Sequence, residues 1–477
     1  MSEVNNSLAA KRVAKLLDEN SFMEIGSMVT SRSTDFNLTS GDTPSDGVIT
    51  GHGLIDGNLV FVYSQDASVL GGTIGEMHAR KIASIYDMAM KMGAPVIGLL
   101  DCAGVRLQES MDALDGLGQI IAKETEASGV VPQITAVFGN CGGGLSVVPA
   151  LSDFSFMEEK GKLFVNAPNT IDGNRTDKCD TSSASYQAEE TGVVDGFGTE
   201  DEILAEIREL VTILPSNNGT GGLSDDCEDD LNRACESMDT MKGDAHYVIS
   251  EIADDHIFVE TKKDFAKGLV TGFIRLNGTT VGVVANNSQI HDENGNLTDE
   301  FKPVFTHRGV DKATELVSFC DAFEIPVLTI TNVKGYKATM CTEKHMAKAL
   351  ARLTYAFANA SVPKVNLIVG DAYGSAYVNM NSKAVGADLV YAWPTAKVTA
   401  MDAELAAKIL YDGASAAELK EKASEYDALQ GSINAAARRG YIDRIVEPVD
   451  TRKYLVAAFE MLYTKSISES MKKHGTK

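Results

Sequence analysis

An internal repeat constrains the fold of this chain more than any other feature of its sequence. Two proline-led apolar segments of the first half, residues 93–101 and 131–139, resemble residues 324–332 and 362–370 of the second half. In both pairs the second copy lies 231 positions after the first. A constant spacing over such a distance indicates a duplicated structural unit.

Each copy of the repeat predicts the same run of elements. A strand enters after a proline, a polar loop follows, and residues 111–128 and 343–360 then have the apolar spacing of a helix. A second proline-led strand runs into a glycine-rich turn. Strands that alternate with helices predict an α/β fold whose sheet is parallel or mostly parallel and covered on its faces.

A polar stretch separates the two copies. Residues 214–222 are rich in Gly, Asn and Ser, and the acidic run 225–230 follows, which is the composition of a linker. We therefore expect two domains, 1–222 and 223–477, within the 477 residues. Residues 286–309 contain an Asn-Gly pair and many polar side chains, so we expect a surface excursion there.

The charge and the cysteine content exclude several functions. The formal net charge is -24, and binding to nucleic acid is not expected because it needs clustered Lys and Arg. An anionic ligand such as CoA can still bind at helix N-termini. The seven cysteines include no C-x-x-C pair and the eight histidines show no ligand spacing, so we expect no metal site and no disulfide framework. With no signal peptide and no membrane-length apolar run evident, we expect a cytoplasmic protein.

Glycine-rich turns end the second strand of each copy, at residues 139–145 and 370–377. Small residues at a strand-to-helix turn let a ligand approach the main chain and leave N–H groups free at a helix N-terminus. This is the geometry of an oxyanion hole, which stabilises negative charge that develops on an oxygen. The alternative is that the glycines only permit a tight turn and close helix packing. Two such turns at the repeat offset favour the functional interpretation.

Four segments carry a resemblance to a known family: residues 71–82, 127–132, 319–323 and 386–396. Through them the chain resembles, over nearly its whole length, the biotin-dependent acyl-CoA carboxyltransferases, such as the β subunits of propionyl-CoA and acetyl-CoA carboxylases. The resemblance extends to the α subunits of biotin-dependent acyl-CoA decarboxylases. The resemblance implies two tandem crotonase-like (ClpP/crotonase) α/β domains and an enzyme that moves a carboxyl group between biotin and the α-carbon of an acyl-CoA.

The resemblance also implies roles for individual residues. The first domain would bind acyl-CoA and the second biotin, without a side-chain base: carboxybiotin releases CO2, the biotin anion takes the α-proton, and the enolate attacks the CO2. The amides of Gly143 and Gly144 correspond to those that hold the thioester oxygen, and those of Ser375 and Ala376 to those that face the ureido oxygen. Further expected contacts are Ala103, Gly104, Arg80 and Lys81 for acyl-CoA, and Gly374 and Val378 for biotin. Arg80 and Lys81 are also compatible with solvated helix positions.

The chain departs from the family pattern beside the second turn. Ser375 stands where the family usually has Gly, and the loop 333–337 lacks the usual proline. Residues 89–92 spell the biotin-attachment tetrapeptide, but they follow a helical stretch and precede Gly93, so we interpret Lys91 as a helix-end residue. We therefore expect biotin on a separate carrier protein.

Several functions and partners remain open at this point. Expected partners are an acyl-CoA substrate, a biotin carboxyl carrier, and either a biotin carboxylase or the membrane subunits of a sodium-pumping decarboxylase that runs the transfer in reverse. A hydratase or isomerase on the same fold needs a carboxylate near the thioester, and the 143–144 turn has no Glu. A non-catalytic subunit is the third alternative. Because the family brings its two sites together between subunits, we expect a homo-oligomer, most often a hexamer.

Overall fold

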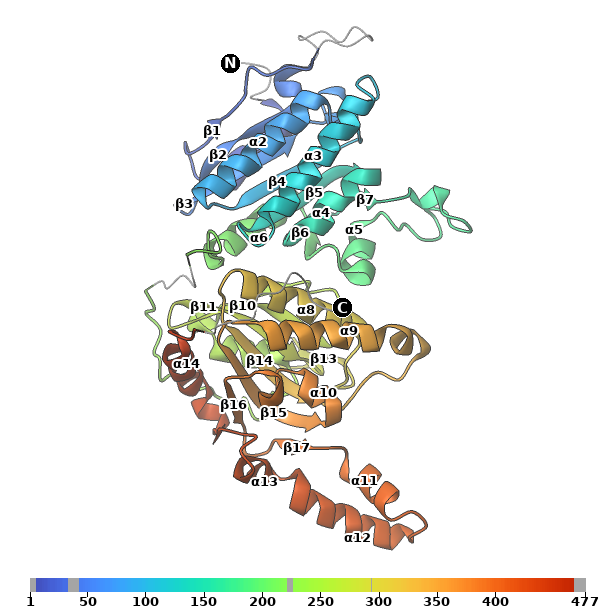
Figure 1. Ribbon diagram of the computed structural model, residues 1–477, viewed down its shortest axis with the longest axis vertical. Coiled ribbons are helices and arrows are strands. Elements are labelled where there is room, and N and C mark those ends of the chain that lie inside the picture. Colours follow the sequence, from blue (N-terminus) through green and yellow to red (C-terminus); the bar gives the residue numbers. More distant parts are fainter. Residues whose placement is uncertain (1–5, 33–42, 221–225, 293, 467–477) are drawn as a thin grey trace. The chain divides into compact units, whose positions relative to one another are not determined.

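The structure, a computed structural model, describes residues 6–32, 43–220, 226–292 and 294–466. The chain divides into two compact units, Met1–Gly221 and Gly222–Lys477 (Figure 1). The boundary expected at 222/223 falls within residues 221–225, which lie outside the described residues.

The first unit is built on a mixed sheet in the order β1-β2-β3-β4-β5-β6-β8, with β7 beside β5. The first three strands pair antiparallel, and the strands from β3 to β8 pair parallel. The strands are β1 Met23–Glu24, β2 Val48–Ile55, β3 Asn58–Gln65, β4 Val96–Cys102, β5 Gln133–Gly142, β6 Phe154–Glu158, β7 Lys162–Phe164 and β8 Gly196–Gly198. β4 is buried along nearly all of its length, as expected for a parallel strand covered on both faces.

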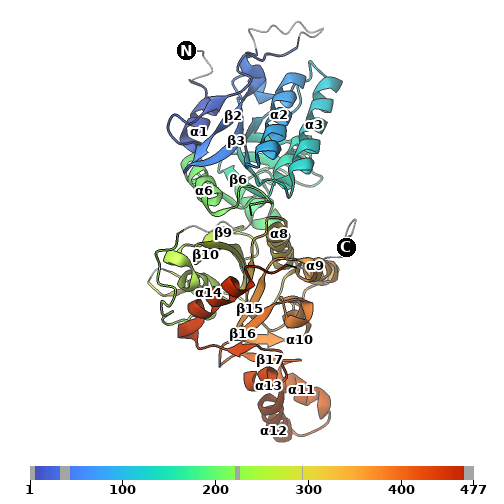
Figure 2. The same cartoon turned by 60° about the vertical axis from the view of Figure 1, so that its left-hand side comes forward.

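Helices cover both faces of this sheet (Figure 2). The long helices α2 and α3 pack side by side, whereas α1 and α6 pack together and contact β3 and β6. The helices are α1 Leu8–Leu16, α2 Glu76–Met92, α3 Met111–Ala127, α4 Val147–Leu151, α5 Ala184–Tyr186 and α6 Glu200–Ile213. α2 ends at Gly93 in the left-handed conformation, with Lys91 exposed in its last turn, so the helix-end interpretation of Lys91 is confirmed.

The second unit repeats the first. Its sheet has the order β18-β16-β15-β14-β11-β10-β9, with β17 beside β15. The strands are β9 Val259–Thr261, β10 Leu269–Leu276, β11 Thr279–Asn286, β14 Val327–Val333, β15 Lys364–Tyr373, β16 Leu389–Ala392, β17 Lys397–Thr399 and β18 Arg444–Ile445. The helices are α7 Ala245–Ile252, α8 His307–Ala322, α9 Met340–Asn359, α10 Gly374–Asn379, α11 Ala403–Leu410, α12 Ala416–Tyr426, α13 Ile433–Arg438 and α14 Thr451–Leu462.

The repeat offset holds at the level of individual strand ends. β14 and β15 begin and end 231 residues after β4 and β5, as the repeated sequence segments predict. β10 and β11 follow β2 and β3 by only 221 residues. The difference arises in one connection, which covers residues 66–75 in the first unit and 287–306 in the second. The expected excursion lies there, as a two-stranded sheet of β12 Gln289–His291 and β13 Leu297–Glu300, and β13 is exposed throughout.

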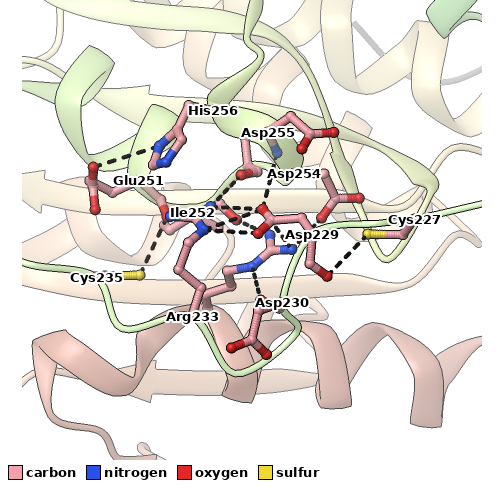
Figure 3. Close-up of polar contacts among 12 residues, drawn as sticks. Cys227, Asp229, Asp230, Arg233, Cys235, Glu251, Ile252, Asp254, Asp255 and His256 are labelled. Carbon is pink, nitrogen blue, oxygen red and sulfur yellow. Dashed lines mark hydrogen bonds and ion pairs between the residues drawn. The ribbon is translucent and has the colours of Figure 1, made fainter.

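Two arginines fasten the first described segment of the second unit to its core (Figure 3). The fully buried Arg452 of α14 donates to the main-chain oxygen of Ile252 and to the Asp254 carboxylate, both at 2.6 Å. Arg233 binds the Asp229 carboxylate and two main-chain oxygens at the end of α7. The segment around residue 230 is thereby held against α7 and α14.

Candidate active site

The loops after β4 and β5 form one cavity in the first unit. The carboxyl ends of neighbouring parallel strands meet at one edge of a sheet, where α/β proteins commonly bind ligands. A shift in register places Cys102 opposite Cys141, and the strands then lead into Ala103–Gly104 and Gly143–Gly144. These four residues line a cavity of about 820 Å³. The remaining lining side chains are uncharged, among them Thr73, Ile74, Leu117, Asn140 and Phe164.

The turn after β5 leaves main-chain donors for a ligand. Residues Gly143–Ser146 (η5) form a tight helical turn that continues into α4. The first N–H groups of a helix have no partner within it, so those of Gly143 and Gly144 are left for another acceptor. Gly143 has a φ of 63°, which residues other than Gly rarely adopt. A Cβ on Gly144 would lie 3.2 Å from Cδ2 of Leu117.

No described residue that lines this cavity is an acid, a base or a reactive thiol. The lining contains no Asp, Glu, His, Lys or Arg. Burial raises the pKa of the Cys102 thiol to about 11, so it remains protonated near neutral pH. Acid–base chemistry in this cavity must therefore rely on groups that the ligands bring.

A buried ion cluster supports the cavity wall. Arg106 pairs with Asp46 at 2.6 Å and with Glu109 at 2.7 Å, and these side chains are fully buried. The two carboxylates also accept from the N–H groups of His78 and Glu76 in the first turn of α2. Arg106 itself directly follows the lining loop and donates to the main-chain oxygen of Thr73. The cluster thus holds α2 and the lining loop together.

Arg80 and Lys81, two of the expected acyl-CoA contacts, are not among the residues that line the cavity. Lys81 is buried, and its ammonium donates to the main-chain oxygens of Ser45 and Val48. Burial lowers the pKa of Lys81 to about 8. Its hydrogen bonds fasten α2 to the start of β2, which is a structural role, and the acyl-CoA contact expected for Lys81 stays a prediction. Arg80 is exposed and pairs with Glu76.

The second unit carries an equivalent turn after β15. Val333 and Ala372 face each other across the same register shift as in the first unit. α10 begins at Gly374, whose φ of 59° nearly equals that of Gly143, its counterpart in the repeat. The first N–H groups of α10 are again without a partner inside the helix. The expected biotin contacts lie together on this helix: Ser375 and Val378 are exposed, and Ala376 is buried.

Three further polar residues join this turn, and sequence reasoning did not identify them as a group. The Tyr336 hydroxyl donates to Oγ of Ser375 at 2.8 Å. Asn379 donates to the Tyr336 oxygen at 3.1 Å, and Thr354 donates to Oδ1 of Asn379 at 2.9 Å. The sequence showed only that both Ser375 and the loop around Tyr336 depart from the family pattern. Nothing in the sequence indicated that Ser375 and the loop around Tyr336 are in contact.

Comparisons with known proteins define the class of this protein. The family model for the carboxyl transferase domain matches residues 2–476. The chain therefore belongs to the carboxyl transferase family, and the expected enzyme class is confirmed.

Particular relatives narrow this class further. The chain is 40% identical to the propionyl-CoA carboxylase beta chain of Roseobacter denitrificans, over 98% of this chain and 92% of the relative. It is 39% identical to the methylmalonyl-CoA decarboxylase subunit alpha of Propionigenium modestum, with the same coverage. Both kinds of relative were expected from the sequence.

A solved structure confirms the fold. The crystal structure of transcarboxylase 12S, a hexamer with hydrolysed methylmalonyl-CoA bound, superposes with a TM-score of 0.91 at 33% identity. It covers 98% of this chain, and this chain covers 92% of it. The expectation of two tandem crotonase-like α/β domains is thus confirmed.

The described residues hold neither a membrane-spanning helix nor a cluster of metal ligands. No helix among them is both long and apolar enough to cross a membrane. Nor do the described parts of the chain hold three His, Cys, Asp or Glu side chains placed to share a metal ion.

Proposed function

We propose that the chain transfers a carboxyl group between biotin on a separate carrier protein and the α-carbon of an acyl-CoA. The observation that carries the proposal is a pair of equivalent turns, at Gly143 and Gly374, each of which begins a helix with free N–H groups. In the first unit the turn opens into a cavity lined by uncharged residues. Such a site suits an uncharged thioester whose oxygen gains negative charge during reaction.

The first turn serves the acyl-CoA in this proposal. The thioester oxygen accepts hydrogen bonds from the amides of Gly143 and Gly144, which stabilise the enolate formed when the α-proton leaves. Ala103 and Gly104, which line the same cavity, flank the acyl group. Because the described lining offers no side-chain base, the proton goes to the other ligand.

The second turn serves biotin. A carbonyl oxygen such as that of the ureido group fits the free N–H groups of Ser375 and Ala376 at the start of α10. When bound there, biotin would supply the carboxyl group. Once the carboxyl group has left it, biotin would also supply the base for the α-proton. Gly374 allows the close approach, and the exposed Val378 borders the same helix face.

Substrate and partners follow from the relatives. The named relatives act on propionyl-CoA or methylmalonyl-CoA, so we infer that this chain takes an acyl-CoA of that size. A carboxylase and a decarboxylase relative are almost equally similar, so decarboxylation is the second candidate function. A biotin carboxylase partner would indicate the first, and membrane subunits the second. We place the enzyme in the cytoplasm, with a biotin carboxyl carrier and in a homo-hexamer like the transcarboxylase 12S core.

A transfer assay tests the proposal. The purified chain is mixed with methylmalonyl-CoA and free biotin, and propionyl-CoA is measured. We expect biotin-dependent formation of propionyl-CoA and an increase in melting temperature with acyl-CoA, because ligand bound to the native state stabilises it. Absence of transfer with free biotin and with a biotinylated carrier alike would indicate a non-catalytic subunit.

A further inference from the structure

The two turns are built on the same scaffold but differ in the side chains that surround them. In the first unit a bridge pairs Ile74 with Val105 beside Gly144. In the second unit the equivalent bridge pairs Phe305 with Tyr336, beside Ser375. The three residues of the second unit lie 231 positions after those of the first: Phe305 after Ile74, Tyr336 after Val105 and Ser375 after Gly144. The second turn has therefore gained two hydroxyl groups where the first has only apolar side chains and a glycine.

Tyr336 is held firmly beside Ser375. Its ring stacks on Phe305 with the ring centres 6.4 Å apart and an interplanar angle of 28°. The main chain is fixed on both sides: Phe305 donates to the oxygen of Gly335, and Lys337 donates to the oxygen of Phe305. The Tyr336 hydroxyl, which donates to Ser375, is therefore held in a fixed position.

The hydrogen bonds around Tyr336 run in one direction. Asn379 is oriented by Thr354 and donates to Tyr336, which in turn donates to Ser375. A hydroxyl has one proton to donate and two lone pairs to accept with. Since Ser375 accepts from Tyr336, its own proton is left for another acceptor. Aligned chains of this kind also strengthen each successive bond.

We propose that the Ser375 hydroxyl is a third hydrogen-bond donor to the oxygen bound at the second turn, alongside the main-chain amides. This inference rests on the proposed function, in which that oxygen belongs to the ureido group of biotin. Ser375 is exposed and lies in the first turn of α10, the turn whose amides are free. Tyr336 is then a positioning residue, because it acts on the ligand only through Ser375. The first turn has no such donor, since Gly144 lacks a side chain.

A double-mutant cycle tests the inference. Transfer from methylmalonyl-CoA to free biotin is measured for Ser375→Ala, Tyr336→Phe and the double variant. We expect Ser375→Ala to lower kcat/KM for biotin by about 10-fold or more, as for a lost hydrogen bond to a charged group. Tyr336→Phe should cost less, and the double variant should equal Ser375→Ala within about twofold, because Tyr336 acts through Ser375. The affinity for methylmalonyl-CoA should not change in any of them.

The outcomes separate this inference from the proposed function. Tyr463→Phe removes an exposed tyrosine hydroxyl at the end of α14 and serves as the control, with unchanged kinetics expected. Wild-type transfer together with full activity of Ser375→Ala contradicts the inference alone. So does a double variant in which the two single losses multiply. If the wild-type chain transfers nothing to biotin, the proposed function fails and this inference fails with it.

Discussion

Gly143 and Gly374 occupy the same place in two different sheets, 231 residues apart, with φ angles of 63° and 59°. Each follows the strand that pairs at the same register shift, and each begins a short helix. Duplication has preserved the backbone of the turn, whereas the surrounding side chains have diverged. In the proposed function, one chain thereby presents main-chain donors to two different ligands.

Gly144→Val should abolish most of the transfer. A Cβ at this position already lies 3.2 Å from Leu117, so the larger side chain must displace the turn or fill the cavity. Loss of one oxyanion donor typically costs about 100- to 1,000-fold in rate, and we expect a loss of that order. The matched control is Gly118→Val on α3, where an added Cβ meets nothing within 4 Å. Equal activity of both variants would contradict the assignment.

Ala376→Val should reduce transfer through the biotin site by a similar factor. Ala376 is only 1% exposed, so the two added methyl groups also overpack the start of α10, at about 1–3 kcal/mol. Melting curves separate this loss of stability from the loss of rate. A variant that is folded at the assay temperature and nearly fully active would show that α10 does not hold biotin.

His246 of α7, which lies beside the carboxylates of Asp244 and Glu260, predicts a pH dependence of stability. Burial alone would lower the pKa of His246, but the neighbouring carboxylates of Asp244 and Glu260 outweigh it and raise the pKa to about 9. A raised pKa means that the protonated form stabilises the fold fully below pH 6.5, and that this contribution is lost as the pH rises through 9. The melting temperatures of wild type and His246→Gln should thus differ below pH 6.5 and converge above pH 9. A constant difference would rule out this role for His246.

Arg452 should be critical for the stability of the second unit. Its side chain is completely buried beside the largely buried Asp254, and Arg452→Ala removes the cation with which that carboxylate pairs. Breaking a buried pair in this way costs about 3–5 kcal/mol. The neighbouring Lys453 forms an exposed pair with Asp450, so Lys453→Ala should cost at most about 1 kcal/mol. Chemical denaturation measures the loss in free energy of unfolding for both variants. Similar losses would contradict the difference expected between a buried and an exposed pair.

Assembly is tested by the size of the particle in solution. We expect a homo-hexamer in light scattering at micromolar concentration, as in the similar transcarboxylase 12S. A fully active monomer would contradict this arrangement.

The fold was largely predictable because the two copies of the repeat mark the same strands and turns at a constant spacing. The starts and ends of the strands at 96–102 and 327–333 follow the repeated apolar segments, and the two glycine turns lie where the sequence placed them. The role of Lys81 was not foreseen, although a signal existed. His78, Lys81, Ile85 and Ala89 share one face of α2, so the lysine continues a buried stripe. A charged residue on such a stripe must find partners, here the carbonyl groups before and in β2.

The contact between Tyr336 and Ser375 could not be predicted from the sequence. Tyr336 lies in the loop after β14 and Ser375 in the first turn of α10. Their contact depends on the register of β14 against β15 and on the rotamer of Tyr336. Periodicity specifies which residues form a strand, but it does not specify which side chains meet beyond its end.

The central claim is that the two turns bind different ligands, and the affinity for acyl-CoA tests it most directly. Titration calorimetry with methylmalonyl-CoA should give a weakened Kd for Gly144→Val and a wild-type Kd for Ala376→Val, because only the first turn contacts the thioester. If Ala376→Val weakens methylmalonyl-CoA binding as much as Gly144→Val does, or if neither variant weakens it, the assignment of acyl-CoA to the first turn and biotin to the second is wrong.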